Sequence, residues 1–276
     1  MKSYLSLHHH HDPVKVVVKG KLCIHRNGAT IMAALFLLVC SPSAGTAAVN
    51  DSTGVDDKSC RFRPSQLIVP SVLITVGSIG VCNGWFHSIN NDIKDGMNGW
   101  RKNAYVKIDD YLQYLPAAAN VGLGLTGIKA KHPLKERIAV TATAYIAMGI
   151  MVNVTKRAVG EKRPDSDARN SFPSGHTATA FMGAELVRKE YGCTAGVCAY
   201  TLAAGVAVMR LYNNRHWLND VFAGAGMGIL SAKIGFWLLP WERRLFGWDG
   251  KKGDTALIPQ IDAGNGSFAM TLYTCF

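Results

Sequence analysis

Charged residues are scarce in this chain. Only 18% of its 276 residues are Asp, Glu, Lys or Arg, whereas about a quarter is usual for a soluble domain. Hydrophobic residues reach 48%, which excludes a disordered or fully polar chain. The apolar residues must therefore be clustered, and a membrane protein becomes the leading class.

The seven cysteines form no C-x-x-C pair and have no His at matching spacing, so neither a zinc site nor a disulfide framework is indicated. We interpret them as small apolar residues of helices. Acidic residues are also few, and the formal net charge is +11. Such a chain could bind nucleic acid, anionic lipid head groups or a phosphorylated substrate, and charge alone does not choose among them.

Residues 1–48 have the pattern of an N-terminal targeting segment. A basic stretch over residues 15–26 precedes an apolar run at 29–40, and small residues follow at 43–48. This order is typical of a secretory signal, with cleavage expected near Ala47 or Ala48.

Apolar stretches recur along the rest of the chain, several of them close to the roughly 20 residues that cross a bilayer. They are rich in Gly and Ala, which let helices pack closely in lipid. The stretches are 67–81, 111–128, 138–154, 177–187, 197–209 and 221–239. We predict an all-α fold, a polytopic membrane bundle of about six helices. The alternative is a large soluble helical bundle.

The segments around these stretches are more polar. Residues 84–110 mix charges with Trp and Phe, a composition that favours a helix at the membrane interface. Residues 249–276 form a polar tail whose loose alternation indicates a possible strand. No internal repeat or linker divides the intervening part, so we treat residues 61–248 as one membrane domain.

Three polar motifs lie at the ends of the expected spans. In the first, Lys156 is followed after six residues by Arg163 and Pro164. An ammonium and a planar guanidinium together suit the oxygens of a phosphoryl group. A plain basic cluster beside the membrane is the alternative for this motif alone.

The second motif, Pro173-Ser174-Gly175-His176, opens the next apolar helix. The first turn of a helix has unpaired backbone N–H groups, so Ser174 and Gly175 can donate hydrogen bonds to an anion. His176 can act as a proton donor near neutral pH. Taken alone, the tetrapeptide could also be a simple turn and helix cap.

The third motif contains Arg210, His216 and Asp220. The last two are four residues apart, which places them on one face if a helix begins by Trp217. A carboxylate there can hold one imidazole nitrogen and leave the other free as a nucleophile or base. A His–Asp pair alone is more commonly a structural hydrogen bond.

Together, the three motifs resemble the signature of the type 2 phosphatidic acid phosphatase superfamily, which is Lys-x6-Arg-Pro, Pro-Ser-Gly-His and Ser-Arg-x5-His-x3-Asp. The chain reads KRAVGEKRP, PSGH and MRLYNNRHWLND, so its one departure is Met209 in place of Ser. The resemblance covers residues from about 67 to 240. It implies a six-helix membrane bundle with an extracytoplasmic site, and makes residues 61–248 a membrane phosphatase domain.

The resemblance also implies a role for each motif residue. His216 would attack phosphorus, Asp220 would orient His216, and His176 would protonate the leaving oxygen before water cleaves a phosphohistidine. No metal or other cofactor is implied. The residues implied for phosphate binding are Lys156, Arg163, Ser174, Gly175 and Arg210.

Longer stretches extend the resemblance. DDYLQYLPAAANVG, NSFPSGHTATAFMGAELV and NNRHWLNDVFAGAGMGILSAKIG look like those of Gram-negative envelope members related to lipid A 4'-phosphatases. We therefore expect a phosphorylated membrane lipid as substrate, with lipid A first and undecaprenyl pyrophosphate or phosphatidylglycerol phosphate as alternatives. The expected location is the bacterial inner membrane with a periplasmic site. We expect no nucleic-acid partner, and the oligomeric state is left open.

Two other classes of function fit the sequence less well. Vanadium-dependent haloperoxidases share the three-part anion site, but they are soluble, and the apolar stretches argue against them. A lipid-binding scaffold without catalysis would not need both histidines and Asp220.

One conflict concerns topology. With a cleaved signal, three full spans before Lys156 would put the site in the cytoplasm. Either residues 29–40 remain attached, or a later stretch such as 67–81 does not cross fully. The basic loop that contains Lys129 and Lys131 is typical of the cytoplasmic side, but the loops that carry the motifs are equally basic. Because part of that second set of charges is explained as phosphate ligands, we favour an extracytoplasmic site.

Overall fold

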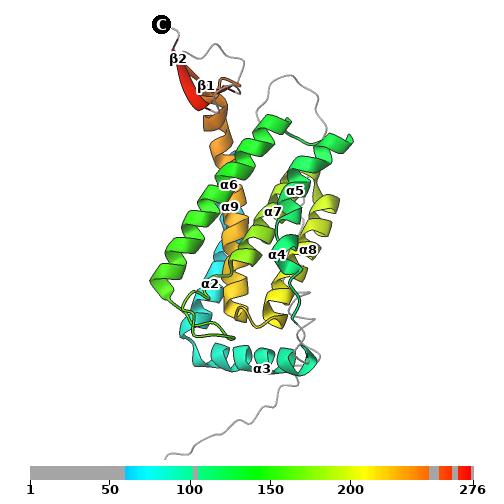
Figure 1. Cartoon of the computed structure of the whole chain (residues 1–276), viewed down its shortest axis with the longest axis vertical. Coiled ribbons are helices and arrows are strands. Elements are labelled where there is room, and N and C mark those ends of the chain that lie inside the picture. Colours follow the sequence, from blue (N-terminus) through cyan, green and yellow to red (C-terminus); the bar gives the residue numbers. More distant parts are fainter. Residues whose placement is uncertain (1–59, 102–104, 249–254, 263–266, 275–276) are drawn as a thin grey trace, which may run out of the picture.

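The computed structural model describes residues 60–101, 105–248, 255–262 and 267–274. Most of these residues form helices that run side by side, and one helix lies across an end of the bundle (Figure 1). The predicted targeting segment, residues 1–48, lies outside the described residues.

The helices come first along the described chain, and two strands follow them. The α-helices are α2 (Ile68–Cys82), α3 (Gly84–Arg101), α4 (Asp109–Leu112), α5 (Leu115–Gly122), α6 (Leu134–Val159), α7 (Gly175–Tyr191), α8 (Cys193–Tyr212) and α9 (Leu218–Leu245). The 3-10 turns η2 (Pro64–Leu67) and η3 (Leu123–Thr126) extend α2 and α5. Strand β1 (Thr255–Asp262) pairs antiparallel with β2 (Ser267–Thr274).

The predicted helical bundle is confirmed. Four helical segments in the described part of the chain are long and apolar enough to cross a membrane. They are Pro64–Cys82, Leu134–Val159, Cys193–Tyr212 and Leu218–Leu245. The chain is therefore an integral membrane protein.

The apolar stretch 111–128 does not form one continuous helix. It is divided among α4, α5 and η3. Pro116 lies in the first turn of α5, where its missing N–H is tolerated. Proline disfavours a helical conformation for the residue before it, so the preceding helix α4 does not continue into α5. Gly127 ends η3 with a φ of 88°, which suits a residue without a side chain. The segment still packs along α7 within the bundle.

Helix α9 forms the centre of the bundle and packs against α2, α6 and α7. Its small residues allow the neighbouring backbones to come close, as is usual for helices in lipid. A Cβ atom added to Gly228 would lie 2.2 Å from the carbonyl oxygen of Ala178 in α7, which shows how tightly these helices pack.

Helix α3 lies across one end of the bundle (Figure 1). It buries Phe86 and Asn90 and exposes Trp85 and Trp100. Part of the segment 84–110 is therefore helical, and its location at a membrane interface stays a prediction. The strand predicted in the tail is one of two, since β1 and β2 form a hairpin beyond the end of α9 (Figure 1).

Several helix ends meet at the end of the bundle that α3 crosses. Helices α6 and α8 end there, while α7 and α9 begin there (Figure 1). Helix α2 also ends there, because Gly77 near its C-terminus lies against Asn219 at the start of α9. The motif residues belong to these ends.

Candidate active site

All three motifs lie at the end of the bundle that α3 crosses. Lys156 is in the last turn of α6, and Arg210 is in the last turn of α8. Ser174 caps the start of α7, and Asp220 lies in the first turn of α9. The antiparallel order of these helices therefore brings distant parts of the chain to one place.

His216 and Asp220 form a buried pair at the start of α9. His216 Nδ1 lies 3.3 Å from Asp220 Oδ2, and His216 is 3% exposed. The same carboxylate oxygen accepts a 2.8 Å hydrogen bond from the Trp217 amide and another from the Ser171 hydroxyl. Asp220 thus fixes the imidazole through Nδ1 and leaves Nε2 for reaction.

Positive charge surrounds His216. Burial lowers the pKa of His216 well below its ordinary value, and Lys156, Arg210 and Arg163 lower it further. The imidazole is therefore neutral at neutral pH, the form that has a free electron pair on Nε2. Three cations from three different segments thus converge on this histidine.

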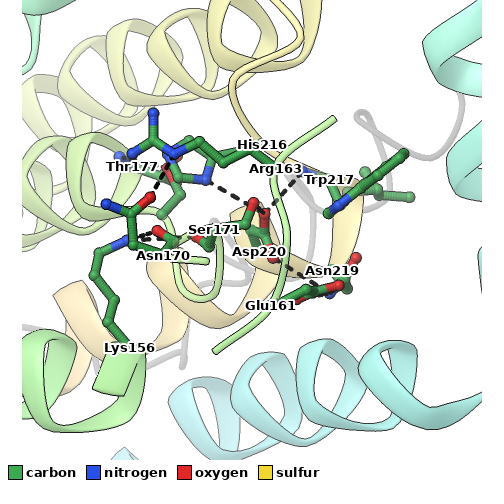
Figure 2. Close-up of polar contacts among 12 residues, drawn as sticks. Lys156, Glu161, Arg163, Asn170, Ser171, Thr177, His216, Trp217, Asn219 and Asp220 are labelled. Atoms are coloured by element: carbon green, nitrogen blue, oxygen red, sulfur yellow. Dashed lines mark hydrogen bonds and ion pairs between the residues drawn. The ribbon is translucent and has the colours of Figure 1, made fainter. Parts of the chain in front are cut away.

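Asn170, in the segment between α6 and α7, accepts hydrogen bonds from two of these cations. Lys156 Nζ donates a 2.7 Å hydrogen bond to the carbonyl oxygen of Asn170, and Arg163 Nε donates one of 2.7 Å to Asn170 Oδ1. Figure 2 shows both side chains reaching Asn170. An ammonium has three donors and a guanidinium has five, so these contacts leave donors for an anion.

Arg210 is almost fully buried, with 4% of its surface exposed. Its Nη1 donates a 2.6 Å hydrogen bond to Asp109 Oδ2 and lies 3.4 Å from Asp110 Oδ1. Its Nε is buried and has no hydrogen-bond partner among the described residues. A buried donor without a partner is costly, so an anion oxygen at Nε would relieve that cost.

The start of α7 is tied to the start of α9. The Ser174 hydroxyl accepts a 3.0 Å hydrogen bond from the Thr177 hydroxyl and caps the Thr177 amide. The Ser174 amide donates a 3.0 Å hydrogen bond to the carbonyl oxygen of Asp220. Because that amide is occupied, the hydroxyl of Ser174 and the amide of Gly175 are the groups left for the predicted contact with phosphate.

Two carboxylates of the site were not predicted from the sequence. Asp110 Oδ1 lies 2.9 Å from His176 Nε2, and Asp109 pairs with Arg210. Both residues come from the stretch DDYLQYLPAAANVG, which contributed only to the family resemblance. The sequence feature that could have identified them is a pair of adjacent carboxylates at the start of an apolar stretch, because such charges need partners.

A second set of polar residues that were not predicted, Glu161, Asn219 and Asn90, lies on the side of Asp220 away from His216. Asn219 Nδ2 donates to Glu161 Oε2 at 3.1 Å, and Asn219 Oδ1 accepts a 2.8 Å hydrogen bond from Asn90 of α3. Figure 2 shows Asp220 between His216 and the Glu161–Asn219 pair. Burial and the neighbouring Asp220 carboxylate raise the pKa of Glu161, so Glu161 keeps its proton and can donate to Asp220.

This arrangement can bind and transfer an oxyanion. It offers a neutral imidazole with a fixed orientation, a second imidazole paired with a carboxylate, and three converging cations. Positioned charges of this kind stabilise a phosphoryl group during transfer. In the described part of the chain, no group of three or more His, Cys, Asp or Glu side chains is placed to hold a metal ion.

The family assignment comes from a comparison with family models. The PAP2 superfamily model matches residues 138–244, a range that contains every motif residue from Lys156 to Asp220. Residues 138–244 belong to the PAP2 superfamily. The predicted superfamily is thereby confirmed, whereas Asp109 and Asp110 come before the PAP2 region.

Two curated relatives match parts of the chain. A lipid A 1-phosphatase of Porphyromonas gingivalis is 41% identical over 138 residues, which are 49% of this chain and 31% of the relative. The bacitracin transport permease protein BcrC of Bacillus licheniformis is 39% identical over 71 residues, 26% of this chain and 34% of the relative. The chain thus spans about a third of the length of the curated relatives it matches.

Two solved structures are also similar to this chain. The crystal structure of Aquifex aeolicus LpxE has 22% identity and a TM-score of 0.41, covering 53% of this chain and 94% of that one. The other is the crystal structure of a transmembrane PAP2 type phosphatidylglycerolphosphate phosphatase from Bacillus subtilis. It has 18% identity and a TM-score of 0.35, covering 82% of this chain and 98% of that one.

Proposed function

We propose that this protein is a membrane phosphatase that removes phosphate from a membrane lipid through a phosphohistidine intermediate. The observation that carries the proposal is the buried His216, held by Asp220 and facing the charges of Lys156, Arg163 and Arg210, which lower its pKa. A neutral imidazole is a nucleophile, and the cations supply the charge that a phosphoryl group requires.

The reaction follows from these positions. Nε2 of His216 attacks phosphorus, and the bond between phosphorus and the leaving oxygen breaks as the nitrogen–phosphorus bond forms. His176 gives its proton to the leaving oxygen, which departs as an alcohol. His176 then takes a proton from water, the resulting hydroxide attacks phosphorus, and the electron pair of the nitrogen–phosphorus bond returns to His216.

We propose lipid A as the first substrate to test. The lipid A 1-phosphatase of Porphyromonas gingivalis is 41% identical over about half of this chain, which supports this class of lipid. The site also lies at a bundle end beside α3, whose Trp85 and Trp100 are exposed, an arrangement suited to a substrate held in a bilayer. The phosphate removed, at position 1 or 4', is an outcome of the test.

We further propose that the site faces the periplasm of a bacterial inner membrane. Lys129, Lys131 and Lys135 lie in or next to the loop at the opposite end of the bundle, as is typical of a cytoplasmic loop. Part of the positive charge at the site end is explained by phosphate binding. Because α2 runs toward the site, this orientation places Cys60, which precedes α2, on the cytoplasmic side.

The test is phosphate release by the purified full chain in detergent containing EDTA, with lipid A and undecaprenyl pyrophosphate assayed side by side. Mass spectrometry of the lipid product identifies the phosphate that is lost. We expect release from lipid A and none from the His216→Ala variant. Preferential release from the pyrophosphate would replace lipid A with a carrier-lipid substrate, and equal release by His216→Ala would refute the mechanism.

A further inference from the structure

The two carboxylates of α4 lie at a site that has to attract an anion. Asp109 and Asp110 face Arg210, and Asp110 also faces His176. Negative charges at a phosphate site repel the substrate, so they weaken its binding unless they serve another step. Neither residue belongs to the three motifs or to the matched region of the chain.

We propose that Asp110 is the positioning residue of the general acid His176. The proposal rests on the phosphatase function proposed above. Asp110 Oδ1 lies 2.9 Å from His176 Nε2, a distance typical of a charge-assisted hydrogen bond. The carboxylate accepts a hydrogen bond from Nε2–H and fixes the ring orientation. It also favours the imidazolium form that must give up a proton, which opposes the lowering of the pKa of His176 by burial and by Arg210.

This contact assigns the two nitrogens of His176. With Nε2–H donated to Asp110, the Nδ1 proton is the one that passes to the leaving oxygen as the phosphorus–oxygen bond breaks. His176 becomes neutral, and Asp110 stays ionised. In the second half of the reaction, Nδ1 recovers a proton from water, so the pair returns to its starting state.

The segment that carries Asp110 is fixed in place. Asn213 at the end of α8 exchanges two hydrogen bonds with the backbone of Val106, at 3.2 and 2.7 Å. Gln113 donates a 2.8 Å hydrogen bond to the carbonyl oxygen of Asp110. A catalytic group gains most from a partner whose own position is fixed, because less order must be imposed during the reaction.

The neighbouring carboxylate has a different task. Asp109 is fully buried, and its carboxylate accepts hydrogen bonds from Arg210 at 2.6 Å and from Asn213 at 3.4 Å rather than from His176. Asp109 therefore holds the phosphate-binding guanidinium, whereas Asp110 holds the proton donor. Loss of each residue should affect a different kinetic parameter.

The experiment compares two substrates with the same alkyl chain, an alkyl phosphate and a nitrophenyl phosphate that carries this chain. An alkoxide needs a proton to leave, whereas a nitrophenolate does not. For Asp110→Asn we expect kcat/KM to fall about 100-fold with the alkyl phosphate and less than about threefold with the nitrophenyl phosphate. Asp167→Asn, at a carboxylate that is 97% exposed, is the matched control and should affect neither substrate.

Further variants separate the alternatives. Asp109→Asn should raise KM for both substrates without distinguishing the leaving groups. Inhibition by vanadate, measured for Asp110→Asn, should stay within about threefold of wild type if the anion site is intact. An equal loss with both substrates, a loss of vanadate inhibition, or full activity with the alkyl phosphate would each overturn the role of Asp110. Absence of turnover in wild type, or turnover in His216→Ala, would instead refute the phosphatase proposal.

Discussion

The backbone amide of Ser174 donates a 3.0 Å hydrogen bond to the carbonyl oxygen of Asp220, which joins the first turns of α7 and α9. Asp220, which holds the proposed nucleophile His216, is thereby linked through the main chain to the motif that carries the proposed proton donor His176. A main-chain hydrogen bond of this kind helps side chains from different helices to keep a fixed separation.

The junction of α7 and α9 depends on Gly224. A Cβ atom at this position would lie 2.5 Å from the carbonyl oxygen of Ser174, which is too close for the two backbones to keep their places. We expect Gly224→Ala to lower kcat/KM at least about tenfold by displacing the start of α7. Gly205→Ala in α8 is the control, because nothing lies within 4 Å of a Cβ there, and equal activity of both variants would contradict this prediction.

The two histidines should differ in the intermediate they leave behind. With a nitrophenyl phosphate labelled on phosphorus, His176→Ala should accumulate a phosphohistidine, because its formation needs no acid while its hydrolysis lacks a base. His216→Ala should retain no label. Acid-labile, base-stable radioactivity on the protein is the measurement, and a labelled His216→Ala variant would show that another residue is the nucleophile.

Glu161 should make stability depend on pH. Burial and Asp220 raise its pKa in the folded protein, whereas the unfolded chain releases this proton near pH 4.3, about the ordinary value for Glu. Stability from the protonated carboxyl is therefore complete at acidic pH and is lost as pH rises through the folded pKa. Gln cannot ionise. The melting temperature of Glu161→Gln, relative to that of wild type, should therefore rise as pH increases.

The measurement for Glu161 is thermal unfolding in detergent over a series of pH values from mildly acidic to alkaline. Asp167→Asn serves as the control, because its carboxylate is 97% exposed, and its difference from wild type should stay constant. A constant difference for Glu161→Gln as well would show that Glu161 titrates alike in the folded and unfolded chain.

The proposed orientation can be tested with reporters fused after α9. This helix begins at the site and ends at the opposite end of the bundle (Figure 1). With a periplasmic site, a C-terminal green fluorescent protein should fluoresce, and a C-terminal alkaline phosphatase should be inactive. The reverse pattern would place the site in the cytoplasm.

Much of the site could be predicted because its chemistry lies in short segments. His216 and Asp220 are four residues apart, and Ser174 and His176 belong to one tetrapeptide, so local geometry alone places them together. The cations Lys156 and Arg210 lie at the ends of apolar stretches, where charge requires an explanation.

The remaining polar partners could not be predicted, because they are paired across long separations. Asp110 meets His176 from a segment 66 residues earlier, and Asn90 meets Asn219 across 129 residues. No periodicity relates such residues, and only the packing of α3 and α4 against the bundle end brings them together. Likewise, Pro116 indicates a helix start but not how the divided segment packs along α7.

The central position of α9 also has a consequence for biosynthesis. Helices α2, α6 and α7 all pack against α9, which is the last of the described helices to leave the ribosome. His216 and Asp220 emerge with it, so a nascent chain has neither its complete core nor its proposed nucleophile until α9 is inserted. Under the proposed mechanism, a partly inserted chain is therefore unable to cleave lipid phosphate.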